Sequence, residues 1–426
     1  MNAVKTNNKQ PHLIVIGGGF GGLQVIKELK NKPLQITWID KNNYHTFQPL
    51  LYQVASGGLG PDAIGYPLRR ISGPIKNVVF RMAEVLTIKP ESNCIETSIG
   101  DLNYDYLLIA TGSATNFYGN ANLEASCMQL KSIPDALDLR SDILQEFEKS
   151  IIHQQPDELK QILNFVVVGG GPTGVETAGA LAEMKLTVLP KDYREVKPEN
   201  MQVHLVESGN ALLTMFDESL SLKAKKSLEK LGVKVWLNTK VENYDGKILT
   251  FNTGEQLITD TVIWSAGVKG KIINGLNPNA IGRGNRYKTD EYNTIAGYEN
   301  IFAIGDVALM TADAKFPNGH PQVAPTAIQQ AGLFAKNLLR HLNNQPLIPF
   351  SYFDKGSMAT IGRHKAVFQS FGIKLSGYIA WFAWMALHLM LLVGFRSRII
   401  VFVNWMWNYF SYQRAIRIIV RPFKRG

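Results

Sequence analysis

Short apolar runs rich in β-branched residues recur along the chain, each with a glycine close behind. Residues 12–16 (HLIVI), 165–168 (FVVV) and 301–304 (IFAI) are three of them. Residues 106–110 (YLLIA) and 262–266 (VIWSA) also run into a glycine, where a backbone can pass close to a ligand. Such runs predict the buried strands of a parallel sheet, and the helical periodicity after the first two predicts an α/β fold.

The first strand leads directly into the turn GGGFGG, followed by a helical pattern and a second strand that ends in Asp40. Gly17 would permit the tight bend, Gly19 would let the backbone approach a pyrophosphate, and Gly22 would let helix and strand pack closely. The helix N-terminus offers free N–H groups to phosphates, and Asp40 is placed to accept from an adenosine ribose. This order predicts a dinucleotide site, with a glycine-rich turn that holds no ligand as the alternative.

The same pattern returns at the turn GGGPTG, residues 169–174, before a helical stretch and a strand that ends in Glu207. Glu207 comes late because a polar stretch with two prolines, residues 187–200, is predicted to be an inserted loop. A carboxylate at the ribose position favours NADH, since it repels the 2′-phosphate of NADPH. Arg194 lies in the inserted loop and leaves this preference open. Two such folds indicate one dinucleotide that stays bound and one that exchanges.

The motifs GGGFGG, ATG, GGGPTG, SAG and AIGD occur in an order that resembles the two-dinucleotide-binding-domain flavoprotein superfamily, over roughly residues 10–345. Residues 43–57 (NYHTFQPLLYQVASG), residues 354–367 (DKGSMATIGRHKAV) and the tail with WFAWMALHLMLLVGFRSR are similar to type II, single-subunit NADH:quinone oxidoreductases. The CxxxxC pair of related disulfide reductases does not occur in this sequence. We expect Cys94 and Cys127 to be apolar packing residues.

The resemblance implies two Rossmann-like dinucleotide-binding domains, for FAD and NADH, plus a C-terminal membrane-associating region. The FAD is expected to be non-covalent, and NADH is the substrate. The expected limits are residues 1–160 for the first part of the FAD-binding domain, 161–285 for the NADH-binding domain, 286–350 for the second part of the FAD-binding domain and 351–426 for the C-terminal region.

The residues expected to contact the dinucleotides occupy the turns and the strand ends. Asp306 ends a strand before a predicted helix and would bind the sugar-alcohol chain of the flavin, with a plain helix N-cap as the alternative. The expected cofactor-binding residues are Gly17, Gly19, Phe20, Gly21, Gly22, Asp40, Lys41, Gln48, Ala110, Thr111, Gly112, Gly169, Gly171, Pro172, Thr173, Gly174, Glu176, Glu207, Ala266, Gly267, Gly305, Asp306 and Ala327.

Two residues are candidates for chemistry with a quinone. Glu176 is expected in the first turn of the second helix, where the helix dipole would also favour an acid. The resembled family has a glutamate at this position that points toward the flavin and is linked to proton delivery, which implies that role for Glu176. The family's AQxAxQ stretch aligns with residues 324–329, with Pro325 in place of the first glutamine. Gln329 remains and would donate to a quinone carbonyl, with a helix-surface glutamine as the alternative.

The C-terminal tail carries the whole charge excess. Residues 355–426 contain 11 Lys or Arg and no acid, whereas the first 354 residues hold 34 basic and 35 acidic side chains. Four of the seven tryptophans also lie in this tail, which includes 21 consecutive uncharged residues, 375–395. We expect an amphipathic region in the headgroup zone, with a membrane-spanning helix or an apolar helix in a dimer interface as alternatives. The dense apolar residues beside the charges disfavour nucleic acid as a partner.

A membrane-bound flavin without a dithiol implies a lipid-soluble acceptor. The predicted activity is FAD-dependent oxidation of NADH with two-electron reduction of a quinone, without proton pumping. The expected partners are a quinone, the lipid membrane surface and a second copy in a homodimer, and no metal is expected. The N-terminus does not resemble a targeting peptide, so a peripheral, monotopic position on the cytoplasmic side of the cell inner membrane is expected. The alternatives are a related flavoenzyme with another acceptor (sulfide:quinone or ferredoxin-type) and a non-catalytic NADH-sensing flavoprotein.

Overall fold

The computed structural model of the chain describes residues 10–153, 155–411, 416–419 and 422–423. Residue contacts divide it into two compact units. The first unit comprises residues up to 45, 66–114 and 268–354, and the second comprises 46–65, 115–267 and the residues from 355 onward. The predicted α/β class is confirmed. The predicted domain limits remain a prediction, because the units are defined by contacts and the domains by their ligands.

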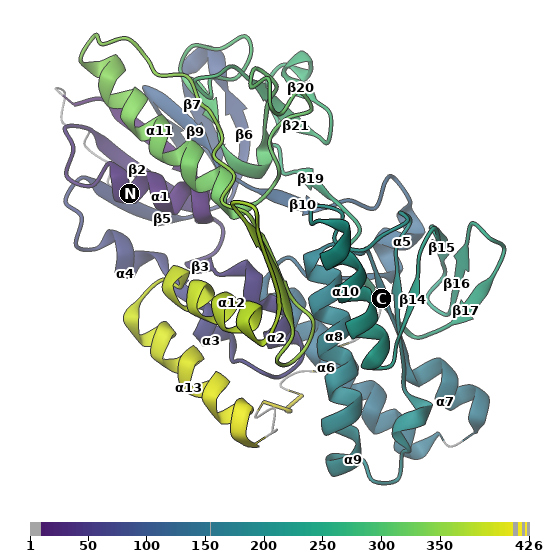
Figure 1. Ribbon diagram of the computed structural model, residues 1–426. Coiled ribbons are helices and arrows are strands. Elements are labelled where there is room, and N and C mark those ends of the chain that lie inside the picture. Colours follow the sequence, from purple (N-terminus) through teal and green to yellow (C-terminus); the bar gives the residue numbers. More distant parts are fainter. Residues whose placement is uncertain (1–9, 154, 412–415, 420–421, 424–426) are drawn as a thin grey trace. The chain divides into compact units, whose positions relative to one another are not determined.

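The first unit is built on a five-stranded parallel sheet in the order β22-β9-β1-β2-β5. All five residues of β1 are buried, as expected for a strand covered on both faces. Helices α1 and α11 lie side by side (Figure 1). The bounds are β1 His12–Ile16, α1 Phe20–Glu28, β2 Gln35–Asp40, α4 Leu68–Ser72, β5 Val78–Met82, β9 Tyr106–Ile109, β22 Ile301–Ala303 and α11 Ala324–Leu342.

Two smaller sheets complete the first unit, β6-β7-β8 and β20-β21-β23. The prediction of a helix after Asp306 is wrong. A single 3₁₀ turn, η5 (Gly305–Val307), is followed by strand β23, whose three apolar residues are buried beside β21. Asp306 is therefore not the cap of an α-helix. The remaining bounds are β6 Val85–Lys89, η2 Pro90–Ser92, β7 Cys94–Thr97, β8 Gly100–Asn103, β19 Val268–Gly270, η4 Pro278–Ala280, β20 Ile281–Gly282, β21 Arg286–Thr289 and β23 Ala308–Met310.

The second unit contains another five-stranded parallel sheet, in the order β11-β18-β12-β13-β14. The predicted strands 165–168 and 262–266 correspond to β12 and β18, its two central neighbours. The bounds are β11 Met128–Gln129, α6 Ile133–Ile152, α7 Pro156–Leu163, β12 Asn164–Val168, α8 Pro172–Thr187, β13 Gln202–Val206, α10 Glu218–Lys230, β14 Val233–Trp236, β15 Val241–Tyr244, β16 Ile248–Phe251, β17 Gln256–Ile258 and β18 Thr261–Trp264.

The stretch predicted to be an inserted loop, residues 187–200, contains short helices instead. Buried apolar side chains explain this, because Val188 and Leu189 are 1% and 0% exposed and Val196 is 2% exposed. The short elements of this unit are η1 Gln48–Leu50, α2 Leu51–Ala55, α3 Pro61–Ile64, α5 Ala121–Ser126, α9 Leu189–Asp192 and η3 Pro198–Asn200. Short strands at the chain passages between the units are β3 Tyr44–Thr46, β4 Gly65–Pro67 and β10 Ser113–Thr115.

The C-terminal region belongs to the second unit and begins with an antiparallel sheet, β24 (Ser357–Thr360), β25 (Ala366–Ser370) and β26 (Ile373–Gly377). Two helices follow, α12 (Tyr378–Leu391) and α13 (Phe395–Ser411). The uncharged run 375–395 is thus divided between the end of β26, helix α12, a short bend and the first residue of α13. Across the described residues, every helix falls short of the length and apolarity needed to cross a membrane.

Candidate active site

The first glycine turn joins β1 to α1 in a geometry that only glycine permits at its start. Gly17 has a φ of +115°, and an added Cβ would lie 2.2 Å from the carbonyl oxygen of Ala110. At Gly22 an added Cβ would lie 1.9 Å from the Gly17 oxygen, which confirms the close packing of helix on strand. Gly19 differs, because no atom lies within 4 Å of its added Cβ. The turn therefore leaves open space at the position where a pyrophosphate is expected.

The N-terminus of α1 has the features of an anion-binding site. Its N-cap is Gly19, no side chain caps the helix, and its first turn has no acid. The first N–H groups of an uncapped helix need an acceptor and favour negative charge. Phe20 and Gly21 lie in this first turn, and Gly21 is buried. These residues fit a dinucleotide pyrophosphate.

Asp40 closes β2 beside the turn. Its carboxylate accepts hydrogen bonds from the Gly18 N–H and the Asn42 N–H, both at 2.6 Å. Burial raises the pKa of Asp40, while these bonds and the charges of Lys41 and Lys271 oppose that rise. The acid thus shapes the turn, and its remaining lone pairs stay available for a ribose hydroxyl. Ribose binding by Asp40 remains a prediction.

His45 is a further residue at the first turn, and the sequence patterns did not indicate it. Its Nδ1 lies 2.8 Å from the carbonyl oxygen of Gly18, and its ring packs edge-on against Phe20. The side chain is 1% exposed, and its Nε2 has no hydrogen-bond partner within the described residues. A buried polar atom without a partner costs free energy, so Nε2 could accept a hydrogen bond from a bound ligand. No spacing rule in the sequence indicates this contact.

The other predicted flavin-side residues of the first unit gather where β9 and β22 end. The N–H of Lys271 donates to the Gly112 oxygen, and the Thr111 hydroxyl donates to the Lys271 oxygen at 2.5 Å. Ser113 donates to the Asp306 carboxylate at 2.6 Å. Gly305 has a φ of +72°. These bonds place Ala110, Thr111, Gly112, Gly305 and Asp306 along the carboxyl edge of the sheet that also carries the glycine turn.

Helix α11 supplies a second residue that sequence analysis missed. Gln330 is 1% exposed and accepts the Gly305 N–H at 2.7 Å. The predicted Gln329 points elsewhere: its amide donates to the Phe353 oxygen at 2.9 Å and accepts the Phe353 N–H at 3.0 Å. The Cβ of Ala327 would lie 3.0 Å from a Cβ added at Gly305, so Ala327 is a close neighbour of Gly305. A quinone contact for Gln329 stays a prediction, and the side-chain NH₂ group carries a second N–H beside the one that it donates to Phe353.

The second glycine turn, in the second unit, repeats the geometry of the first. Gly169 has a φ of +112°, and its added Cβ would lie 2.8 Å from the Ala266 nitrogen. At Gly174 an added Cβ would lie 1.8 Å from the Gly169 oxygen, whereas Gly171 faces open space. Helix α8 starts at Pro172, without a side-chain cap or an acid in its first turn. This turn also fits a pyrophosphate.

Glu207 follows β13 and binds the second turn as Asp40 binds the first. Its carboxylate accepts the N–H groups of Gly170 and Gly209, each at 2.6 Å. Tyr118, which the sequence did not single out, lies over Gly267 at the end of β18. A Cβ added at Gly267 would be 2.4 Å from the Tyr118 hydroxyl oxygen. The Tyr118 ring is 70% exposed on a backbone with φ +54°, so an aromatic face is presented at this strand end.

Glu176 lies deeper than predicted. Helix α8 begins at Pro172, so Glu176 is its fifth residue rather than part of the first turn, and the helix-dipole interpretation is wrong. The side chain is 7% exposed and accepts the Thr360 N–H at 3.2 Å. Burial raises the pKa of Glu176 to about 8, and the bonds from Thr360 partly oppose this rise. An acid with this pKa can hold a proton at neutral pH and release it.

Several other features bear on the chemistry. Cys94 and Cys127 are buried and unpaired, and burial raises the pKa of the Cys127 thiol to about 12. Gln48 begins η1 in the second unit. The described residues contain no group of His, Cys, Asp or Glu side chains suited to a metal ion.

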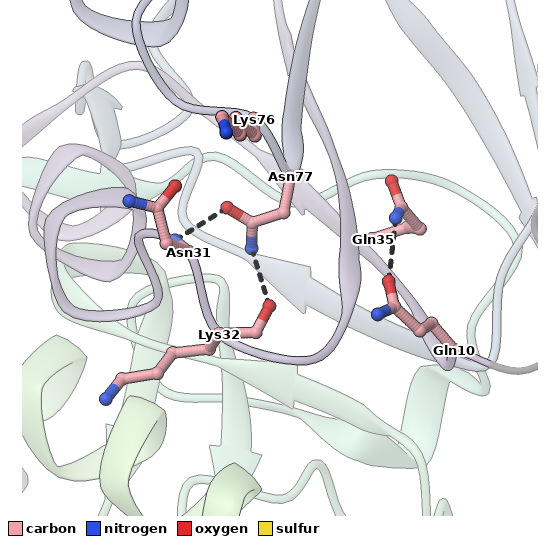
Figure 2. A pocket seen from close by; sticks show the side chains of 6 residues that line it. All are labelled: Gln10, Asn31, Lys32, Gln35, Lys76 and Asn77. Carbon is pink, nitrogen blue, oxygen red and sulfur yellow. Dashed lines mark hydrogen bonds between the residues drawn. The ribbon is translucent and has the colours of Figure 1, made fainter.

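A polar hollow of about 430 Å³ lies on the first unit (Figure 2). It is found where β2 begins, at the opposite end of that strand from Asp40. Asn77 accepts the Asn31 N–H at 2.8 Å and donates to the Lys32 oxygen, while Gln35 donates to Gln10. The amide groups of Asn77, Gln35 and Gln10 therefore bond within the lining of the hollow, and no candidate site residue lines it.

Two uncapped glycine turns, each with an acid after the next strand, fit an oxidoreductase that binds a flavin and a nicotinamide dinucleotide. Comparison with known proteins agrees. Residues 11–331 match the family described as pyridine nucleotide-disulphide oxidoreductase, and residues 355–412 match the NDH2 C-terminal domain. The chain belongs to this family and, within it, to the type II NADH:quinone oxidoreductases. Membership implies a flavin and NADH.

Individual relatives support this placement over nearly the whole chain. The type II NADH:quinone oxidoreductase NdhA of Mycobacterium tuberculosis is 38% identical, covering 92% of this chain and 86% of that protein. The Haemophilus influenzae enzyme of the same description is 30% identical, covering 89% and 93%. The structure of NDH2 from Plasmodium falciparum in complex with NADH shares the fold, with a TM-score of 0.88, 23% identity and coverage of 97% and 100%.

Proposed function

We propose that the chain oxidises NADH through non-covalently bound FAD and reduces a membrane quinone by two electrons, without proton pumping. The observation that carries this proposal is the pair of open glycine turns, at Gly19 and Gly171, each above an uncapped helix N-terminus. Relatives named for this reaction, at 30% identity or more over most of their length, support it.

The first turn, with Asp40 and His45, would hold FAD, and the second turn, with Glu207, would hold NADH. When bound, FAD supplies the hydride and electron-pair chemistry that protein side chains lack. The chain's own contribution is position, exclusion of water and a proton source. Glu176 would hold that proton at its carboxyl and give it to the quinone oxygen.

An anaerobic absorbance titration of the purified protein tests the proposal. We expect a yellow chromophore that NADH bleaches in a one-to-one ratio and that menadione restores. A colourless protein that does not take up added FAD would overturn the proposal. Bleaching without recovery would favour a sensor of NADH instead. Sulfide as the electron donor is disfavoured because both cysteines are buried and unpaired.

Selection of NADH over NADPH is proposed to rest on Glu207. We expect Glu207→Gln to lower the ratio of kcat/KM for NADH to that for NADPH by roughly 10-fold, because the charge that repels a 2′-phosphate is lost. Glu207→Asp retains the charge and should keep most of the preference. Steady-state kinetics with both coenzymes measure this, and an unchanged ratio in Glu207→Gln would contradict the assignment.

We also propose that α12 and α13 hold the protein on the cytoplasmic side of the cell inner membrane as a peripheral, monotopic protein. Phe382, Phe395 and Trp407 are 53%, 75% and 60% exposed, which is unusual for large apolar side chains. Arg396 and Arg398 are exposed beside them. Each basic residue near anionic lipid contributes about 1 kcal/mol, and the apolar rings would enter the headgroup zone. A homodimer remains a further prediction.

Membrane binding can be tested with the C-terminal region in place. Trp384 and Trp405 of the same helices are 2% and 8% exposed, so these buried side chains can be kept while the exposed ones are replaced. We expect the triple variant Phe382→Ser, Phe395→Ser, Trp407→Ser to lose roughly 10-fold or more in partition to vesicles containing anionic lipid. Co-sedimentation measures this.

The matched control removes three exposed apolar side chains elsewhere on the second unit. Ile152, Leu186 and Met215 are 78%, 52% and 52% exposed, and their replacement by Ser should leave partition unchanged. Equal binding by both triple variants would refute the membrane role of α12 and α13.

A further inference from the structure

Four side chains connect the Glu176 carboxyl to helix α13 within the second unit. The Thr360 hydroxyl on β24 lies 3.5 Å from the same carboxylate oxygen that accepts the Thr360 N–H. The Tyr52 hydroxyl on α2 lies 2.9 Å from the Thr360 hydroxyl. Gln53 donates to the Tyr52 oxygen at 3.0 Å, and the Trp405 indole donates to the Gln53 carbonyl oxygen at 2.8 Å.

The donors in this series can all point toward Glu176. An indole N–H can only donate, so the Gln53 side chain must turn its oxygen to Trp405 and its NH₂ to Tyr52. The Tyr52 oxygen then accepts from Gln53. Either hydroxyl of the Tyr52–Thr360 pair could be the donor, and Tyr52 donates when Thr360 gives its own proton to the Glu176 carboxylate. The Thr360 hydroxyl, which accepts from Tyr52, has its proton left for Glu176. The indole donor on α13 thus fixes the direction of the two bonds made by Gln53, and the bond from Thr360 to Glu176 fixes the direction of the Tyr52–Thr360 bond.

We propose that Thr360, Tyr52 and Gln53 are positioning residues that orient the Glu176 acid and set how readily it releases its proton, with Trp405 of α13 fixing the far end. The inference rests on the proposed function, in which Glu176 supplies a proton to the quinone. It adds that the region proposed to contact the membrane also determines the state of that acid.

The electrostatics agree with a series that favours the carboxylate. Hydrogen bonds to the charged form lower the pKa of an acid, and those from Thr360 act against the rise that burial causes at Glu176. Burial, together with the negative charges of Glu176 and Glu183, raises the pKa of Tyr52, so this hydroxyl stays a donor.

Among the described residues, few other titratable groups influence the pKa of Glu176. Tyr52 on α2 is the titratable group that faces Glu176, and β24 presents the uncharged Thr360. Glu183, further along α8, acts on Tyr52 instead. Helices α9 and α10 and strands β12, β13 and β14 also pack against α8, and among the described residues they place no charged side chain that acts on Glu176.

The test follows protonation of the acid directly. Infrared difference spectra across pH report the carbonyl stretch of a protonated buried carboxyl, and loss of the band in Glu176→Gln assigns it. In the purified flavoprotein we expect a titration midpoint near 8. Thr360→Val should raise that midpoint by about one pH unit, because a hydrogen bond to the charged form is lost. Tyr52→Phe and Trp405→Phe should raise it by less.

Two controls separate this role from mere packing. Thr360→Ser keeps the hydroxyl and should restore the midpoint. Thr177→Val removes another buried hydroxyl of α8, one that donates to the Thr173 oxygen instead, and should leave the midpoint unchanged. If Thr360→Val and Trp405→Phe lower stability while the midpoint stays constant, the series is structural and the proposal is wrong.

The pH profile of quinone reduction, measured by stopped flow after reduction with NADH, distinguishes the two levels of the argument. If Glu176→Gln reduces quinone at the normal rate, the proposed role of Glu176 fails. If Glu176→Gln is slow but Thr360→Val leaves the wild-type midpoint, only the positioning series fails. A shift that appears in both the spectra and the rates supports it.

Discussion

Replacing Glu176 with Gln is expected to slow the reduction of quinone by about 100-fold while the reduction of the flavin by NADH stays close to normal. The side chain is 7% exposed, and burial raises its pKa to about 8. A positioned acid or base contributes on the order of 100-fold or more to a proton-transfer step. Gln keeps the shape and accepts the Thr360 N–H, but it cannot release a proton. Stopped-flow measurement of the two half-reactions separates the steps.

The pH dependence of quinone reduction follows from the raised pKa of Glu176. Below about pH 8 the Glu176 carboxyl holds its proton, so quinone reduction in the unmodified protein should fall as pH rises through about 8. The Gln variant should lack this descent. The free energy of unfolding should also fall as pH rises toward about 8. The raised pKa of Glu176 in the folded state contributes stability that is lost as the carboxyl gives up its proton.

An exposed acid of the same unit serves as control. Glu229 on α10 is exposed and pairs with Lys225, and Glu229→Gln should leave both half-reactions and the pH profile unchanged. If Glu176→Gln slows the NADH step as much as the quinone step, the residue serves substrate binding rather than proton transfer.

The parts of the site that sequence predicts well are those in which one short segment determines the structure. The turn at Gly17 is an example: the strand, the glycines and the helix are contiguous, and Asp40 follows on the next strand. The backbone angle of +115° and the 2.2 Å approach to Ala110 are consequences that only glycine satisfies. The same reasoning holds for Gly169.

The parts that sequence predicts poorly depend on segments that meet only in the folded chain. Glu176 and Thr360 are 184 positions apart, and no local pattern indicates that one donates to the other. The absence of a hydrogen-bond partner for the Nε2 of His45 among the described residues is likewise apparent only in the folded structure. The misjudged helix after Asp306 has a different cause, because a four-residue apolar run has no period that separates a strand from a helix.

The two open glycines allow the two nucleotide sites to be tested against each other. At Gly19 and at Gly171 an added Cβ meets no atom within 4 Å, so alanine at either position should leave the fold and its stability intact. The methyl group would, however, occupy the space where a pyrophosphate approaches the backbone. We expect Gly19→Ala to lower the bound flavin per chain, with an FAD affinity reduced by roughly 10-fold or more.

Gly171→Ala should keep its full flavin content and raise the KM for NADH by a similar factor, because only the exchanging dinucleotide is affected. Flavin absorbance per chain and steady-state kinetics measure the two effects, and thermal unfolding checks the fold. Gly17→Ala and Gly174→Ala are the contrasting controls: their added Cβ atoms lie 2.2 and 1.8 Å from backbone oxygens, so these variants should lose stability as well. If Gly19→Ala retained flavin and instead raised the KM for NADH, the two sites would have been assigned in reverse.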